Sequence, residues 1–157
     1  MSYRITPLPL APFTGLFGFD DEALRARGAR RIVAESANSA PCRVSLRDAE
    51  PGERLILASW THLADPASPY RAGGPVFVRE NAVEAAPVFD DVPPMLGRRL
   101  LSARAYDAHW MMLDADVVDG ADLDARLRLW LADPEIRTVH LHTARRGCYM
   151  AAATAAP

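Results

Sequence analysis

The sequence predicts an α+β fold: one domain, residues 1–157, in which a mainly antiparallel β-sheet is covered on one face by two helices. Three observations lead to this prediction. A length of 157 residues suits a single hydrophobic core. Hydrophobic residues make up 50% of the chain and charged residues 24%, which is an ordinary globular composition. Short segments of alternating polarity are separated by turns, whereas only two segments carry helix start and stop signals.

The first elements are expected at the margin of the sheet. Residues 3–10 form an extended segment, and its two prolines confine it to an edge because proline has no amide donor. A short helix capped by Asp20 or Asp21 then runs to about Arg27. Residues 30–35 follow as a strand.

The middle of the chain predicts the centre of the sheet. Residues 55–62 are the best strand in the sequence, since both of its faces are fairly apolar. Residues 64–74 are rich in Gly, Pro and Asp, which predicts a loop leading to a second strand at 75–79. Residues 81–96 contain three prolines and no periodic pattern, so we expect them to serve as a connection.

A hairpin and the second helix come next. Two segments of alternating polarity between residues 100 and 118 predict an antiparallel hairpin in which odd-numbered residues oppose odd-numbered ones. Arg104 would then face Asp114 or Asp116 in a cross-strand ion pair. The helix, residues 119–132, carries an apolar stripe at i, i+4, i+7 and i+8 and is the most clearly indicated element.

The last hairpin spans residues 137–152, and its turn decides where Cys148 points. A three-residue turn would place Cys148 on the face of His142. A four-residue turn would instead pair Thr143 with Cys148 and leave Tyr149 beside His142. We expect the first arrangement, because three-residue loops that end in a left-handed glycine are the more frequent.

Charge and hydropathy argue against two classes of function. The 18 basic and 20 acidic residues give a net charge of −2, so no nucleic-acid footprint follows. The N-terminus has no basic segment followed by an apolar run, and we expect neither a signal peptide nor a membrane span. Two cysteines far apart in the sequence fit reduced thiols, which predicts a cytoplasmic protein.

The segment 68–75 is the first candidate site. Amides freed by its two adjacent glycines can form a nest for an anion, and an arginine can supply the charge. The competing interpretation is a plain connecting loop, since glycine and proline are ordinary loop residues. The predicted substrate-binding residues are Arg43, Tyr70, Arg71, Gly73, Gly74 and Arg79.

Histidines and cysteines supply two further candidates. His140 and His142 alternate along one strand, where two imidazoles can reach one metal with Cys148 as a third ligand. No other ligand stands at a diagnostic spacing, so we predict no metal site and leave the cofactor unassigned. Cys42 is followed by arginines that would lower its thiol pKa. Free cysteine is also often buried and inert. Cys42, Cys148 and His142 are the candidate catalytic residues, and His62 or His140 can also supply the base.

Four segments carry a resemblance to a known family: PCR at 41–43, LRDAEPGERLIL at 46–57, SPYRAGGPVFVRE at 68–80 and RRGCY at 145–149. Through them the chain resembles the bacterial family named domain of unknown function 1203. The resemblance implies a compact bacterial domain and carries no activity, cofactor or catalytic residue.

The function we expect is binding or turnover of a small anionic metabolite at the arginine- and glycine-rich loop. One alternative is a non-catalytic protein-interaction module, which would include a homodimer. The other is a thiol-dependent enzyme that uses Cys42 or Cys148. A pocket with converging arginines would favour the first, an apolar two-fold patch the second, and a thiol within reach of an imidazole the third.

Overall fold

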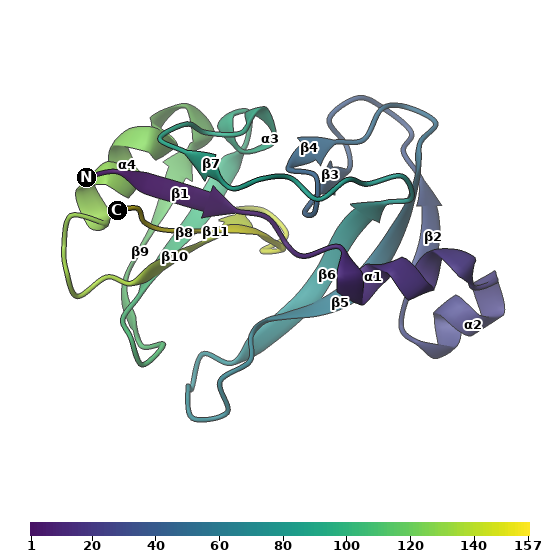
Figure 1. Ribbon diagram of the computed structural model, residues 1–157, viewed down its shortest axis with the longest axis horizontal. Coiled ribbons are helices and arrows are strands. Elements are labelled where there is room, and N and C mark those ends of the chain that lie inside the picture. Colours follow the sequence, from purple (N-terminus) through teal and green to yellow (C-terminus); the bar gives the residue numbers. More distant parts are fainter.

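The computed structural model describes residues 1–157 as two β-sheets that lie side by side, with short helices around them (Figure 1). The first sheet contains β1 (Tyr3–Thr6), β7 (Val88–Phe89), β8 (Leu100–Tyr106), β9 (Met112–Asp119), β10 (Thr138–Thr143) and β11 (Tyr149–Ala155). The second contains β2 (Arg30–Val33), β3 (Pro41–Cys42), β4 (Arg47–Asp48), β5 (Arg54–Leu63) and β6 (Ala72–Arg79).

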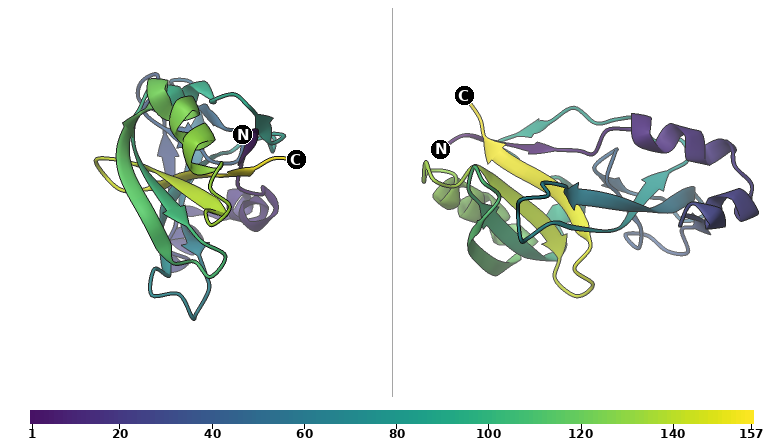
Figure 2. Two further views of the ribbon diagram at one scale, coloured as in Figure 1. Left: turned by 90° about the vertical axis from the view of Figure 1, so that its left-hand side faces the viewer. Right: turned by 90° about the horizontal axis from the view of Figure 1, so that it is seen from below.

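The strand order is β7-β1-β11-β10-β8-β9 in the first sheet and β2-β5-β6-β3-β4 in the second. All neighbouring pairs are antiparallel except β3 and β6. The two ends of the chain meet in the first sheet, where β1 pairs with β11, and both termini lie beside this sheet (Figure 2). The predicted α+β class is confirmed, but with two sheets in place of the predicted one.

The structure has four α-helices where two were predicted: α1 (Ala11–Thr14), α2 (Asp21–Ala26), α3 (Pro94–Gly97) and α4 (Leu123–Trp130). Single 3₁₀ turns, η1 (Gly15–Gly18) and η2 (Gly120–Asp122), adjoin α1 and α4. The predicted helices are α2, whose cap Asp20 accepts a hydrogen bond from the Ala23 amide, and α4. The missed helices are single turns that carry a proline at their first or second residue and are too short to show a periodic pattern.

Each sheet has its own hydrophobic core. The first core contains 19 buried residues, and joins alternate residues of β8 and β10 to the apolar stripe of α4. The second contains 12, and joins β5 and β6 to α1 and α2. None of the helices combines the length and the apolar character that crossing a membrane requires.

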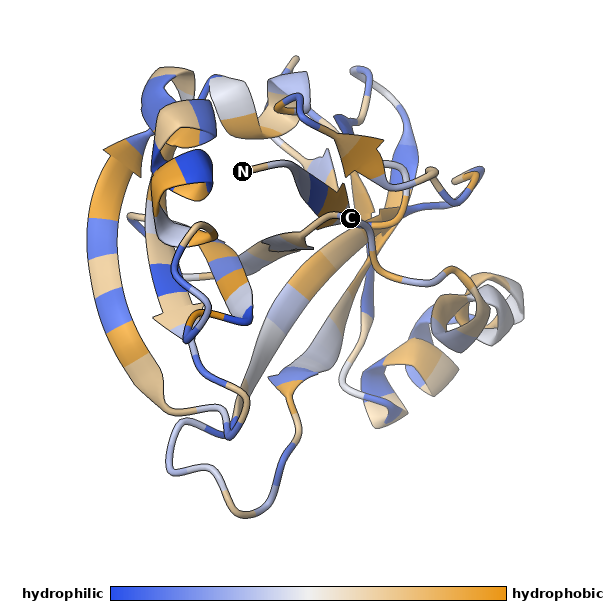
Figure 3. Cartoon of the chain, turned by 60° about the vertical axis from the view of Figure 1, so that its left-hand side comes forward, coloured by the Kyte–Doolittle hydropathy of each residue, from blue (hydrophilic) through white to orange (hydrophobic).

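The hairpin of β8 and β9 has a different register from the one predicted. Tyr106 pairs with Met112, two even-numbered residues, but Leu113 is then the extra residue of a β-bulge. Beyond the bulge, even-numbered residues of β8 pair with odd-numbered residues of β9. Arg104 therefore lies opposite Ala115 and faces neither of the two aspartates predicted as its partner. Polar and apolar residues alternate along β9, visible as bands in Figure 3, and most of its side chains remain exposed.

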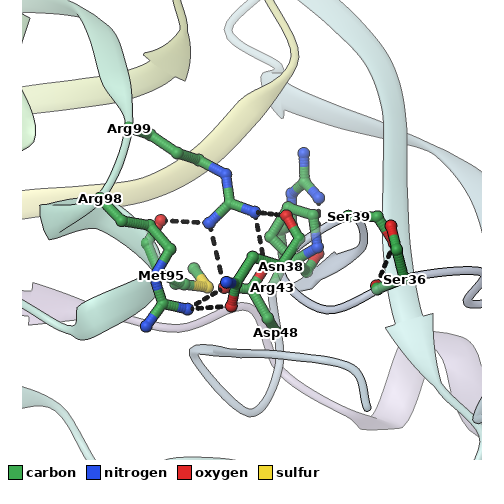
Figure 4. Close-up of polar contacts among 9 residues, drawn as sticks. Ser36, Asn38, Ser39, Arg43, Asp48, Met95, Arg98 and Arg99 are labelled. Atoms are coloured by element: carbon green, nitrogen blue, oxygen red, sulfur yellow. Dashed lines mark hydrogen bonds and ion pairs between the residues drawn. The ribbon is translucent and has the colours of Figure 1, made fainter. Parts of the chain in front are cut away.

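A buried carboxylate joins the two sheets. Asp48 on β4 is 6% exposed at its side chain and accepts hydrogen bonds of 2.6 Å from both Arg98 and Arg99, which directly precede β8 (Figure 4). Asn38 completes the cluster: its side-chain oxygen accepts from Arg98 and its carbonyl from Arg99. This cluster, Asp48 with Asn38, Arg98 and Arg99, fixes the position of one sheet against the other.

Candidate metal centre

Three histidines from different parts of the chain meet between the two sheets. His62 lies near the end of β5, and His140 and His142 lie on β10. Ring nitrogens of the three lie within 4.8 Å of one another. His140 and His142 are 2% and 0% exposed, whereas His62 is only half-buried. His62 is therefore the most solvent-accessible of the three imidazoles.

Strand alternation explains the two histidines of β10. Successive side chains of a strand point to opposite faces, so His140 and His142 share one face while Val139 and Leu141 point to the other. Those two aliphatic residues belong to the core beneath α4. Packing of the aliphatic face therefore turns both imidazoles towards the second sheet.

A β-bulge brings His62 into the cluster. Thr61 of β5 pairs with Gly73 of β6, but the next pair is Leu63 with Ala72, so His62 is the extra residue. Bulges bend a strand and redirect a side chain. A Cβ atom on Gly73 would lie 2.8 Å from the carbonyl oxygen of Trp60, so the close backbone approach at this bulge requires glycine.

Replacing Gly73 with Ala should displace the bulge and move His62 away from the other two imidazoles. We expect a loss of about 1–3 kcal/mol in the free energy of unfolding, the usual cost of forcing extra atoms into a packed site. Gly74 is the matched control, because nothing lies within 4 Å of a Cβ atom there. Urea denaturation and the NMR shifts of the His62 ring should change in the first variant only; equal effects would contradict this role of Gly73.

Aromatic rings surround the three imidazoles. Tyr149 stacks on His62 with ring centroids 5.2 Å apart, and Tyr106 and Trp110 lie 5.1 and 5.4 Å from His140. Trp110 has a φ of 59°, a left-handed conformation that is rare for a bulky residue. Its carbonyl accepts a 2.8 Å hydrogen bond from the Ser68 hydroxyl, which ties the β8–β9 turn to the β5–β6 loop. These rings shield the imidazoles from water on several sides.

Hydrogen bonding leaves imidazole nitrogens free. Nδ1 of His142 lies 2.9 Å from the Gly147 carbonyl, which can only accept, so Nδ1 carries the proton and Nε2 keeps its lone pair. Nε2 of His142 and Nδ1 of both His62 and His140 are buried and have no hydrogen-bond partner. Buried polar atoms of proteins are almost always paired, so three unpaired nitrogens in one place suggest a ligand that they bind.

Burial keeps the imidazoles neutral. It lowers the pKa of His140 to about 3 and that of His142 to about 4, although the hydrogen bond to the Gly147 carbonyl opposes the shift at His142; the positive charge of Arg104 adds a smaller lowering at both rings. Burial also lowers the pKa of His62. All three rings are therefore uncharged near pH 7, which is the form that binds metals.

The arrangement suits a tetrahedral metal. Zinc binds imidazole nitrogen at about 2.0–2.1 Å, which places neighbouring ligand atoms about 3.3 Å apart. The ring nitrogens lie within 4.8 Å of one another, and side-chain rotations that move each nitrogen by about 1 Å would bring them to that spacing. The backbone carbonyl that holds His142 is the kind of outer-shell partner that metal-binding histidines have.

Cys148, considered above as a third ligand, is not part of the cluster. The predicted turn is wrong: the Thr143 amide donates to the Cys148 carbonyl and His142 pairs with Tyr149, so the loop has four residues. Two side-chain bonds favour it, one from the His142 ring to Gly147 and one from the Cys148 amide to the Thr143 hydroxyl. Tyr149, not the thiol, therefore stands beside His142.

The predicted anion-binding residues do not converge on one site. Gly73 and Gly74 lie in β6 and not in a loop, so the predicted nest is wrong. Arg43 is buried and donates to the carbonyls of Tyr149 and Pro41. Arg79 forms an ion pair with Glu53, and Arg71 is exposed. Arg43 and Tyr70 lie near the histidines: the charge of Arg43 contributes to lowering the pKa of His142, and the Tyr70 ring is 6.0 Å from that of Tyr106.

Neither thiol has an imidazole as hydrogen-bond partner. The sulfur of Cys42 is buried and accepts a hydrogen bond of 3.3 Å from the Arg79 amide. Cys148 is partly exposed and unpaired. The predicted pair of His142 and a catalytic thiol is therefore not assembled, whereas His62, considered only as a base, is the residue that joins the other two histidines.

Comparison with known proteins yields one match. A family model described as "Protein of unknown function (DUF1203)" matches residues 39–154, a range that includes all three histidines. No curated protein and no solved structure matches the chain.

Proposed function

The chain belongs to the DUF1203 family, and from its three clustered histidines we propose that it binds one divalent transition-metal ion, zinc above all, through His62, His140 and His142. Two observations carry this proposal: each of the three histidines has a buried ring nitrogen without a hydrogen-bond partner, and ring nitrogens of the three lie within 4.8 Å of one another. In a protein of marginal stability, three unpaired polar atoms are costly unless they bind something.

The donor set favours zinc over the hard cations. Three neutral imidazoles suit zinc, copper, iron or nickel, whereas calcium and magnesium require oxygen ligands. Structural zinc sites usually have four protein ligands and include cysteine. A site of three histidines resembles catalytic sites in leaving a fourth position for water or a substrate. A metal-dependent reaction, as Lewis acid or as source of bound hydroxide, is the chemistry that this centre would support.

We place this function in the cytoplasm of a bacterium, as the sequence led us to expect. Both cysteines are free, which suits a reducing compartment. Of the alternative functions, the thiol-dependent enzyme has less support, because Cys42 is buried in a core and bonded to a backbone amide.

A zinc titration tests the proposal. Protein freed of metal with a chelator should take up one zinc ion per chain in competition with a chromophoric chelator. Zinc at 1,000 times its dissociation constant should raise the free energy of unfolding by about 4 kcal/mol, provided that the unfolded chain does not bind it. Urea denaturation with and without zinc measures this shift. Absence of stoichiometric binding by zinc, copper, nickel and cobalt would refute the proposal.

A further inference from the structure

Arg104 lies next to the three histidines. It is the residue of β8 that pairs with His140 on β10, and paired residues of neighbouring strands point to the same face with Cβ atoms about 5 Å apart. The positive charge of Arg104 contributes to lowering the pKa of all three histidines, which agrees with this position. The side chain is half-buried.

Arg104 has no carboxylate partner. The ion pair expected with Asp114 or Asp116 does not form, because the bulge in β9 places Ala115 opposite Arg104. Asp116 is paired with Arg126 of α4 at 2.6 Å. The Arg104 guanidinium donates from Nε to the Ser102 hydroxyl at 3.2 Å, and its hydrogen bond with Tyr106 opposes the rise in the pKa of that phenol caused by burial. Neither partner is a carboxylate, so the charge of Arg104 has no anionic partner within the protein.

Charge balance then calls for an anion. The charged side chains that act on the imidazole pKa values, Arg104 and Arg43, are positive, and no carboxylate is among them. A divalent metal ion would add two positive charges to the site, and its three neutral imidazole ligands would supply no negative charge to offset them. Clustered charge of one sign in a partly buried site is unfavourable unless an opposite charge compensates it.

We propose that the centre binds a small oxyanion, a carboxylate or a phosphate group, with one oxygen on the metal and another accepting hydrogen bonds from Arg104. This inference rests on the proposed metal site. The planar guanidinium suits a two-oxygen contact with such a group. The anion enters from the side of half-buried His62 and of Tyr70, which is 37% exposed. In this proposal, the anionic ligand expected from the sequence binds beside the histidines and not at Arg71 of the loop before β6.

Cobalt-substituted protein tests this inference, because the visible bands of bound Co²⁺ respond to a change in its ligands. Acetate and inorganic phosphate, titrated separately at constant ionic strength with perchlorate, should each shift the bands, and the tighter of the two identifies the oxyanion class. Arg104→Met should still bind one Co²⁺ ion per chain, because a positive charge beside the site is removed and no ligand is lost, but anion binding should weaken by about tenfold or more, the loss expected for a charge-assisted hydrogen-bonded pair.

Arg71→Met is the matched control: it removes an exposed arginine from the loop before β6 and should leave anion binding unchanged. A protein that binds Co²⁺ but shows no response to either anion would overturn this inference and leave the metal site intact. Unchanged anion affinity in Arg104→Met would also overturn it. Failure to bind Co²⁺ at all would instead refute the metal site on which it rests.

Discussion

Replacing His62 with glutamine should lower the zinc affinity of the protein by at least about 100-fold. Loss of an outer-shell partner alone costs about 10- to 100-fold, and His62 supplies one of only three proposed ligands. Its half-buried position makes it the safest of the three to change, since glutamine can keep contact with water there. Competition with a chromophoric chelator measures the affinity, and a circular dichroism spectrum shows that the fold is retained.

His109→Gln is the control for this experiment. It is the fourth histidine of the chain, lies exposed in the turn between β8 and β9, and is not part of the cluster. Its replacement should leave the affinity unchanged. His142→Gln, which removes a fully buried ring, should abolish the stabilisation by zinc as well. If the His62 variant bound zinc as tightly as the unmodified protein, this residue would not be a ligand.

Replacing Asp48 with asparagine should destabilise the protein by about 3–5 kcal/mol, the cost of removing one partner from a buried charge cluster. The Asp48 side chain is 6% exposed and bridges Arg98 and Arg99, whose side chains are 40% and 16% exposed. Without the carboxylate, two neighbouring guanidinium groups would lose the anionic partner that they share across the junction of the two sheets, and the Arg99 group has little solvent to screen its charge. Urea denaturation of the metal-free protein measures the loss.

Asp116→Asn provides the comparison for Asp48. It also breaks an arginine–aspartate pair, with Arg126, but the aspartate side chain there is 42% exposed. Exposed pairs contribute about 0–1 kcal/mol, so the change should be small. Equal losses in the two variants would mean that the Asp48 cluster does not join the sheets more strongly than a surface ion pair does.

The two predictions separate function from stability. Each member of the Asp48 cluster is hydrogen-bonded to another member, so the cluster should stabilise the protein whether or not metal is present. The histidine cluster has unpaired nitrogens, so its rings add little to the stability of the metal-free protein and should stabilise it only when they bind a ligand. A protein that tolerates such a cost in its interior usually does so at a functional site.

Local patterns in the sequence determined the α+β class, the presence of the β8–β9 and β10–β11 hairpins and the helices α2 and α4, but neither the register of the first hairpin nor the turn of the second. These features depend on neighbouring residues: an aspartate cap for α2, an apolar stripe for α4, and alternating polarity for β10. The segments shared with the family were also recognisable without coordinates, and the family match over residues 39–154 confirms that resemblance.

Only the tertiary structure decided the functional site. His62 reaches His140 and His142 because one extra residue in β5 redirects its side chain, and Arg104 is left unpaired because one extra residue in β9 shifts the register. A bulge changes which face a residue occupies, and its position depends on packing between strands that are distant in sequence. Period-two alternation alone therefore placed the histidines of β10 correctly but could not bring His62 to them.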